Sequence, residues 1–65
     1  MKTVYVFLAD GFEEVEALTP IDVLRRAGLQ VITVSVMEEQ VVKGAHGVPV
    51  VADVLFADID PEGAD

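Results

Sequence analysis

Four carboxylates fall within a short stretch just after the first apolar run of the chain. They are Asp10, Glu13, Glu14 and Glu16. Carboxylates at this density can move protons as general acids or bases, or bind a hard cation through oxygen. Other catalytic groups are scarce, because the sequence has no cysteine, no serine in a nucleophile-elbow motif and a single histidine, His46. The 65 residues therefore contain no complete catalytic set.

Two interpretations compete for Glu13 and Glu14. Together with Asp10 they form an acidic cluster that suits a hard cation, but first-turn carboxylates are explained more simply by the helix dipole. We therefore predict no metal site. Glu16 is either a solvated glutamate on a helix surface, as the rarity of buried glutamates suggests, or a carboxyl group among apolar neighbours. In the second case desolvation favours the neutral acid, which can donate a hydrogen bond.

The remaining charged groups are predicted to be structural. Asp22 and Arg26 have the spacing of a helical i, i+4 ion pair. His46 is interpreted as a plain loop histidine, because polar side chains on loops are usually solvated. The other basic residues are interpreted as solvated charges: Arg25, Lys2 and Lys43.

Charge and composition limit the classes of partner. Four basic and twelve acidic residues give a net charge of −8, which disfavours nucleic acid and anionic membrane surfaces as partners. The early apolar run from Val4 to Ala9 is too short for a signal sequence or a membrane span. No G-x-G-x-x-G motif follows it, so nucleotide binding has no support. We expect a cytoplasmic protein of one small domain whose stability is marginal.

A strand, a turn and a helix are expected in succession. Residues 3–9 are β-branched and aromatic without alternating polar positions, which is typical of an interior strand covered on both faces. Asp10 and Gly11 indicate a strand-to-helix turn. The helix should end at Ala27 or Gly28. Pro20 should kink or restart it, with Thr19 and Pro20 as a cap.

A second strand over residues 31–36 completes a parallel βαβ unit with a right-handed crossover. Residues 41–43 and 48–51 flank a glycine-rich turn and predict an antiparallel hairpin, in which Pro49 confines one arm to an edge. Residues 54–59 are expected to form a short helix. The tail over residues 60–65 is turn-like and stops where a further strand would be expected.

The block FLADGFEEVEALTPIDVLRRAGLQV, followed by VSV and then KGAHGVPVVAD, resembles the N-terminal part of the ThiJ/PfpI superfamily. The branch it resembles most is the parkinsonism-associated protein deglycase group. The resemblance implies a flavodoxin-like α/β sandwich, related to glutamine amidotransferases, of which residues 1–65 supply the first βαβ unit and a small hairpin. The remainder of this single domain, including a reactive cysteine and its histidine, would lie beyond Asp65.

The resemblance also implies roles for individual residues. Glu16 matches the family glutamate that shares a proton with the cysteine. Glu13, Arg26 and His46 match positions at the rim of the pocket or of the dimer, although relatives tend to carry a stronger base at the position of His46. The implied activity is a cofactor-free, glyoxalase-like or deglycase-like reaction on small reactive carbonyls, carried out by a homodimer.

Three alternatives remain open at this stage. The whole protein could be an intracellular peptidase or amidase, since the superfamily includes such members. It could be a non-catalytic redox sensor or chaperone. Residues 1–65 could also be a truncated chain that needs a partner, with the C-terminal remainder as a separate chain. The 65 residues alone are expected to be inactive, because the nucleophile is absent.

Overall fold

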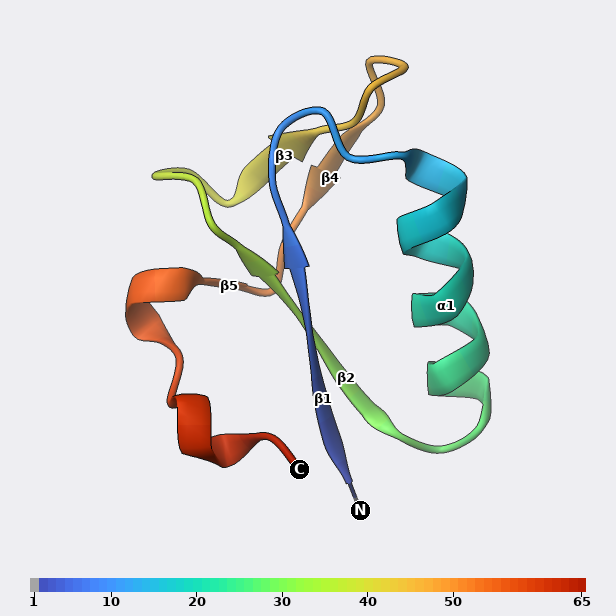
Figure 1. Ribbon diagram of the computed structural model, residues 1–65, viewed down its shortest axis with the longest axis vertical. Helices are drawn as coiled ribbons and strands as arrows, with labels where there is room; N and C mark the ends of the chain where they lie inside the picture. The colour runs from blue at the N-terminus through green and yellow to red at the C-terminus, as the bar shows by residue number, and fades with distance from the viewer. Residues whose placement is uncertain (1) are drawn as a thin grey trace.

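A helix packs against a short parallel sheet, and a small hairpin lies at one end of that sheet (Figure 1). This arrangement is seen in a computed structural model, which describes residues 2–65. The elements in chain order are β1 (Thr3–Leu8), α1 (Glu14–Arg26), β2 (Gln30–Ser35), β3 (Val41–Lys43), β4 (Pro49–Val51), β5 (Val54–Leu55) and the 3-10 turns η1 (Phe56–Asp58) and η2 (Pro61–Gly63). The predicted α/β class, with a βαβ unit and a hairpin, is confirmed.

The sheet has the strand order β1-β2-β5, and both pairings are parallel. Its register runs from Thr3 opposite Gln30 to Leu8 opposite Ser35. The apolar sequence of β1 predicts a strand in the interior of the complete sheet, which stays a prediction, because within residues 2–65 the central strand is β2 and β1 lies at an edge. In this part of the chain β1 has only one strand partner. Phe7 on β1 is 52% exposed.

The C-terminal segment reaches the second edge of β1, close to its start. Asp65 donates its backbone N–H to the carbonyl of Thr3 (2.9 Å), and its carboxylate accepts the N–H of Thr3 (2.7 Å). The hydroxyl of Tyr5 donates to the carbonyl of Asp60 (2.7 Å). The rest of that edge has no strand partner in the part of the chain that the structure describes.

The helix is one continuous element from Glu14 to Arg26, so the expected restart at Pro20 is wrong. A proline at this position removes a single backbone donor, while Ile21 on the next position is buried and holds the helix to the sheet. The end of the helix is as predicted. Gly28 takes a φ of 89°, its N–H bonds to the carbonyl of Arg25, and the following N–H closes a Schellman motif onto Leu24.

The segment after the hairpin differs from its prediction. The sequence predicts a helix over residues 54–59, but Val54 and Leu55 pair with β2, and only the 3-10 turn η1 follows. The start of this strand is held by Asp53, whose carboxylate accepts the backbone N–H and the hydroxyl of Thr33 (2.9 and 3.0 Å). The open edge of β2 therefore takes up Val54 and Leu55 as a strand, because pairing with a neighbouring strand outweighs local propensity.

Arg25 takes part in the same network, so its interpretation as a solvated charge is wrong. Its Nη2 donates to the carbonyl of Val31 (2.9 Å) and to the carboxylate of Asp53 (3.0 Å). The guanidinium thus joins the end of α1 to β2 and to the start of β5. The buried apolar side chains come from β1, α1, β2, β3 and the residue after β4, and they are Leu8, Ile21, Val31, Val34, Val42 and Ala52.

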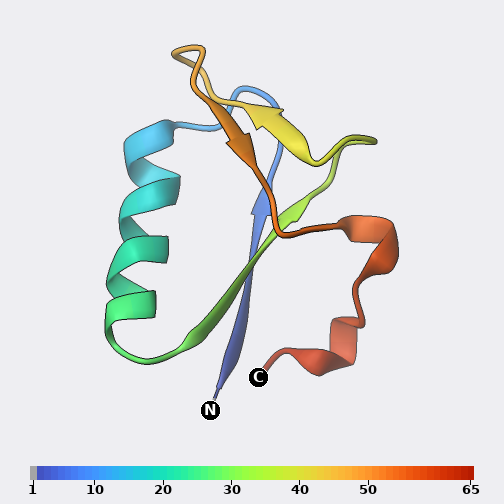
Figure 2. The same cartoon turned by 180° about the vertical axis from the view of Figure 1, so that it is seen from behind.

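The hairpin of β3 and β4 lies across the end of the sheet at which β1 and β2 finish (Figure 2). It confirms the predicted antiparallel pair, with Val42 opposite Val50. Within residues 2–65, no helix combines the length and the apolar character needed to cross a membrane.

Candidate functional site

The loop between β1 and α1 is fastened to the hairpin. Gly11 donates its N–H to the carbonyl of Lys43 (2.8 Å), and the carboxylate of Asp10 accepts the N–H of Lys43 (3.0 Å). Further along both segments, Ala45 donates its N–H to the carbonyl of Phe12 (2.7 Å). Gly11 has a φ of 90°, a conformation that side chains disfavour. The loop therefore brings the start of α1 beside the hairpin tip.

The hairpin tip is a type I turn followed by a glycine. Gly44 and Gly47 close it through a 3.0 Å hydrogen bond from the N–H of Gly47 to the carbonyl of Gly44, and Gly47 has a φ of 83°. This is the common three-residue hairpin loop with a G1 bulge. It leaves His46 near the apex of the turn, with both its backbone N–H and its ring turned towards α1.

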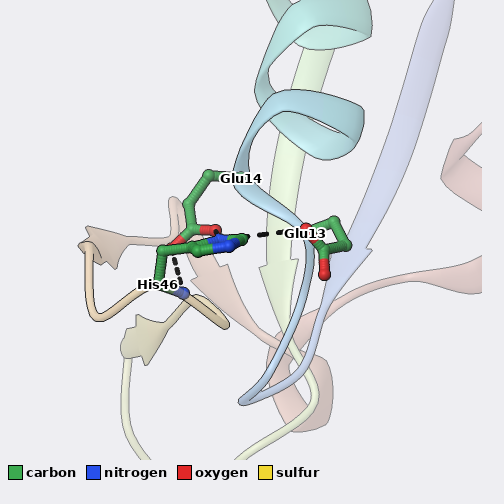
Figure 3. A group of neighbouring side chains, drawn as sticks. All are labelled: Glu13, Glu14 and His46. Carbon is green, nitrogen blue, oxygen red and sulfur yellow. Dashed lines mark hydrogen bonds and ion pairs between the residues drawn. The ribbon is translucent and has the colours of Figure 1, made fainter.

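Glu14 is the residue that connects the two elements (Figure 3). Its Oε2 accepts the backbone N–H of His46 (2.8 Å) and, more weakly, that of Val48 (3.4 Å), while its Oε1 lies 2.9 Å from Nδ1 of His46. The side chain of Glu14 is only 11% exposed. A buried carboxylate requires such partners, because burial without them is costly.

The electrostatics of the pair agree with this geometry. The hydrogen bond from the His46 side chain lowers the pKa of Glu14 to about 2, against an opposing effect of burial. The same hydrogen bond, followed by the charges of Glu14 and Glu13, raises the pKa of His46 above its ordinary value. The two groups therefore favour a carboxylate facing an imidazolium.

Gly44 makes room for this carboxylate. A Cβ atom at position 44 would overlap the side chain of Glu14, with its Cδ at 2.5 Å and its Cγ at 2.8 Å. Gly44 is not in the left-handed region, so its backbone would accept any residue. The glycine is thus needed for space at the contact between α1 and the hairpin.

The predicted site residues fall into two groups. Glu13 and His46 come together, since Oε2 of Glu13 lies 3.8 Å from Nδ1 of His46. Arg26 lies at the opposite end of α1, where it forms the predicted i, i+4 ion pair with Asp22 (3.2 Å) between two largely exposed side chains. The structure does not bring Arg26 to the other two, and the predicted rim role of these residues stays a prediction.

Glu16 lies in the first turn of α1 and is exposed. Its carboxylate has no hydrogen bond or ion pair among the residues that the structure describes. A hollow beyond the ends of β1 and β2, which Glu16 does not line, is formed by Asp10, Val36, Met37, Glu38, Glu39 and Val41. Open α/β sheets bind their ligands at this end of the strands.

Sequence reasoning missed the role of Glu14. It treated Glu13 and Glu14 as equivalent first-turn carboxylates, whereas Glu13 is the N-cap position and only Glu14 turns inwards. His46 also differs from its prediction as a plain loop histidine, since it bonds to Glu14. The available signal was the pair of glycines around His46, which indicates a tight turn but not what that turn contacts.

Comparison with known proteins assigns the chain to a family. The family model described as the DJ-1/PfpI family matches residues 2–65. The chain belongs to the DJ-1/PfpI family. The superfamily resemblance drawn from the first helix and the hairpin is therefore confirmed at the level of the family.

Individual relatives and solved structures agree with this assignment. The chain is 45% identical to protein DJ-1 homolog A of Arabidopsis thaliana over 89% of this chain and 15% of that protein. It is 38% identical to an uncharacterized protein of Staphylococcus epidermidis, over 98% of this chain and 37% of the relative. The structure of oxidized Toxoplasma gondii DJ-1 superposes with a TM-score of 0.94 at 39% identity, over 98% of this chain and 35% of that one.

A DJ-1 superfamily protein of Salmonella typhimurium, solved as a cysteine-to-alanine mutant, superposes with a TM-score of 0.87 at 43% identity. It is matched over 89% of this chain and 31% of its own. The 65-residue DJ-1/PfpI chain thus spans about a third or less of the length of these proteins. The aligned part is the N-terminal part of the DJ-1 fold, with its parallel sheet, helix and hairpin.

Proposed function

We propose that residues 1–65 form the N-terminal part of a cysteine-dependent, cofactor-free DJ-1/PfpI enzyme that acts on small reactive carbonyls. The reaction is of the glyoxalase or deglycase type, and the branch is the parkinsonism-associated deglycase group. Family membership over residues 2–65 supports this proposal. Two solved relatives are consistent with it, since one was solved with a cysteine replaced by alanine and the other is described as oxidized.

The observation that carries the proposal is the position of Glu16. Its carboxylate stands in the first turn of α1, shortly after β1 ends, and is left without a partner by residues 2–65. Val15 beside it is 77% exposed. An exposed carboxylate beside an exposed apolar side chain could pack against another part of the domain, and in the proposed enzyme that part carries the cysteine.

In the proposed reaction the cysteine thiolate attacks the aldehyde carbon of a 2-oxoaldehyde, and a C–S bond forms to give a hemithioacetal. Glu16 then takes the proton from that carbon and returns it to the neighbouring carbonyl carbon. The first carbon is oxidised to a thioester while the second is reduced to an alcohol. Water cleaves the thioester, which releases a 2-hydroxy acid and restores the thiol. No external oxidant or cofactor is needed.

A chimera tests the role of Glu16. It joins residues 1–65 to the remaining part of Toxoplasma gondii DJ-1, whose matching segment has the same fold. We expect turnover of methylglyoxal by the chimera, and a loss of about 100- to 10,000-fold in kcat for Glu16→Gln, the range usual for a general acid or base. The matched control is Glu62→Gln, which changes an exposed glutamate on η2 and should leave kcat unchanged.

Other outcomes would redirect the assignment. Hydrolysis of peptide or amide substrates without methylglyoxal turnover would favour the peptidase or amidase alternative. A cysteine that oxidises readily but supports no turnover would favour a redox sensor or chaperone. An unchanged kcat in Glu16→Gln would remove Glu16 from the mechanism. The homodimer, the cytoplasmic location and the rim role of Glu13, Arg26 and His46 belong to the same proposal and are untested.

A further inference from the structure

Three side chains at the junction of α1 and the hairpin tip form a compact set of metal ligands. Glu13 and Glu14 come from the start of the helix and His46 from the turn, and one ligand atom of each lies within 4.8 Å of the others (Figure 3). We propose that Glu13, Glu14 and His46 bind a divalent cation of the Zn²⁺ class. This site is separate from Glu16 and does not depend on the proposed enzymatic function.

The distances suit such an ion. Nδ1 of His46 lies 2.9 Å from Oε1 of Glu14 and 3.8 Å from Oε2 of Glu13. Two ligands bound to zinc at about 2.1 Å are about 3.4 Å apart in a tetrahedron. The two distances lie on either side of this value. Small rotations of the exposed Glu13 side chain and of the imidazole would therefore seat an ion without moving the backbone.

The backbone already orients the most buried ligand. Oε2 of Glu14 accepts the N–H groups of His46 and Val48, which fixes the plane of the carboxylate and leaves Oε1 directed at the imidazole. Hydrogen bonds of this kind, made to the atoms that do not touch the ion, are what hold metal ligands in place. Gly44 lies against the same carboxylate and leaves the space that it occupies.

Two of the three ligands are exposed to solvent and the third is buried. The side chain of Glu14 is 11% exposed, whereas those of Glu13 and His46 are 57% and 74% exposed. An ion could enter between the two exposed ligands, and water could complete its coordination, as in zinc sites with three protein ligands. Its partners would be one imidazole nitrogen and two carboxylates, a donor set that suits Zn²⁺ better than the all-oxygen preference of Mg²⁺ and Ca²⁺.

The net charge of −8 also favours a cation here. Two carboxylates face one imidazole, so the cluster remains anionic even if that imidazole is charged. A bound ion would join the first turn of α1 to the hairpin tip, in addition to the backbone bonds that already connect the loop to β3. The bound ion is expected to stabilise the contact between α1 and the hairpin tip. The stability of the folded chain should then increase with the free metal concentration.

The test is a titration of the purified 65-residue chain with Zn²⁺ by calorimetry and with Co²⁺ by visible absorption. The informative variant is His46→Arg, which keeps a cation facing Glu14 but removes the ligand nitrogen. Glu13→Gln removes one ligand and leaves the contact between Glu14 and His46. Each variant should weaken binding more than about tenfold. Glu62→Gln, which changes a carboxylate of η2, should leave the affinity unchanged.

Two results would overturn the proposal. One is a Zn²⁺ affinity in His46→Arg equal to that of the parent chain, which would indicate scattered binding to surface carboxylates. The other is a Co²⁺ spectrum that matches the hydrated ion at saturating protein. If a variant of the 65-residue chain does not fold, the same titrations are repeated in the chimera with Toxoplasma gondii DJ-1. The parent chimera and each variant chimera differ at a single position, so a difference in affinity between them still tests that ligand. No turnover is measured, so failure here would leave the enzymatic proposal untouched.

Discussion

Replacing Gly44 by alanine should separate α1 from the hairpin. The new Cβ would lie 2.5 Å from Cδ and 2.8 Å from Cγ of Glu14, and the backbone of Gly44 adds no strain of its own. The carboxylate must therefore leave its position or the turn must shift. Overpacking of this kind costs about 1–3 kcal/mol. The equilibrium constant for folding should fall by roughly 5- to 150-fold.

The assay is urea denaturation of the chimera, together with hydrogen exchange at the amides of His46 and Val48, whose N–H groups bond to Glu14. A double-mutant cycle isolates the cause. In a Glu14→Ala background the Gly44→Ala change should cost little, because nothing remains to collide with the methyl group.

Gly47→Ala serves as the matched control for this cycle. A methyl group added at position 47 would meet open space, but the φ of 83° is one that L side chains rarely adopt. The cost of this substitution is therefore backbone strain of about 1–2 kcal/mol. That cost should be the same with and without the Glu14 side chain. If Gly44→Ala were equally costly in both backgrounds, the collision with Glu14 would not be the reason for the glycine.

Three further predictions concern the contacts around the site, each measured in the chimera with a chelator present. Asp53→Ala should lower the free energy of unfolding by about 2 kcal/mol, because it removes a charged acceptor of the N–H and hydroxyl of Thr33, and a urea midpoint shift tests this. Leu8→Ala should cost about 2–5 kcal/mol, because Leu8 is 1% exposed; a loss below 1 kcal/mol would contradict its place in the core. Exchange protection of the hairpin tip should depend on pH in two directions. The lowered pKa of Glu14 gives protection that is present above its ordinary value of 4.5 and is lost as the pH falls through about 2. The raised pKa of His46 gives protection that is complete below 6.5 and is lost as the pH rises through the shifted value. Protection should therefore be greatest between pH 4.5 and 6.5, and a flat profile would contradict the ion pair.

Local signals in the sequence were sufficient to predict the βαβ unit and the hairpin. The apolar run after Thr3 indicates a strand, and the glycines at 28 and 47 indicate a helix end and a tight turn; the structure has all three, with positive φ at both glycines. The prediction failed at residues 54–59, where short-range propensity did not register that β2 offers an open edge for Val54 and Leu55. The conformation of that segment is determined by pairing with a strand that is distant in the sequence.

In the candidate site, too, local sequence signals failed where the contact joins residues that are distant in the chain. Glu16 was predicted as a site residue from its place in a family motif, and no local pattern distinguished Glu14 from Glu13. The difference between these neighbours arises because α1 starts at Glu14 and the hairpin tip lies against that turn. The contact joins residues that are 32 positions apart in the chain. Arg25 and Asp53, which are 28 positions apart, were missed for the same reason.

The role of Glu16 in catalysis is tested by comparing methylglyoxal turnover in three proteins: the purified 65-residue chain, the chimera with Toxoplasma gondii DJ-1, and the chimera carrying Glu16→Gln. We predict no turnover by the 65-residue chain, clear turnover by the chimera and its loss in Glu16→Gln. Turnover by the 65 residues alone, which contain no cysteine, or full activity of the chimera without the Glu16 carboxylate, would contradict the account.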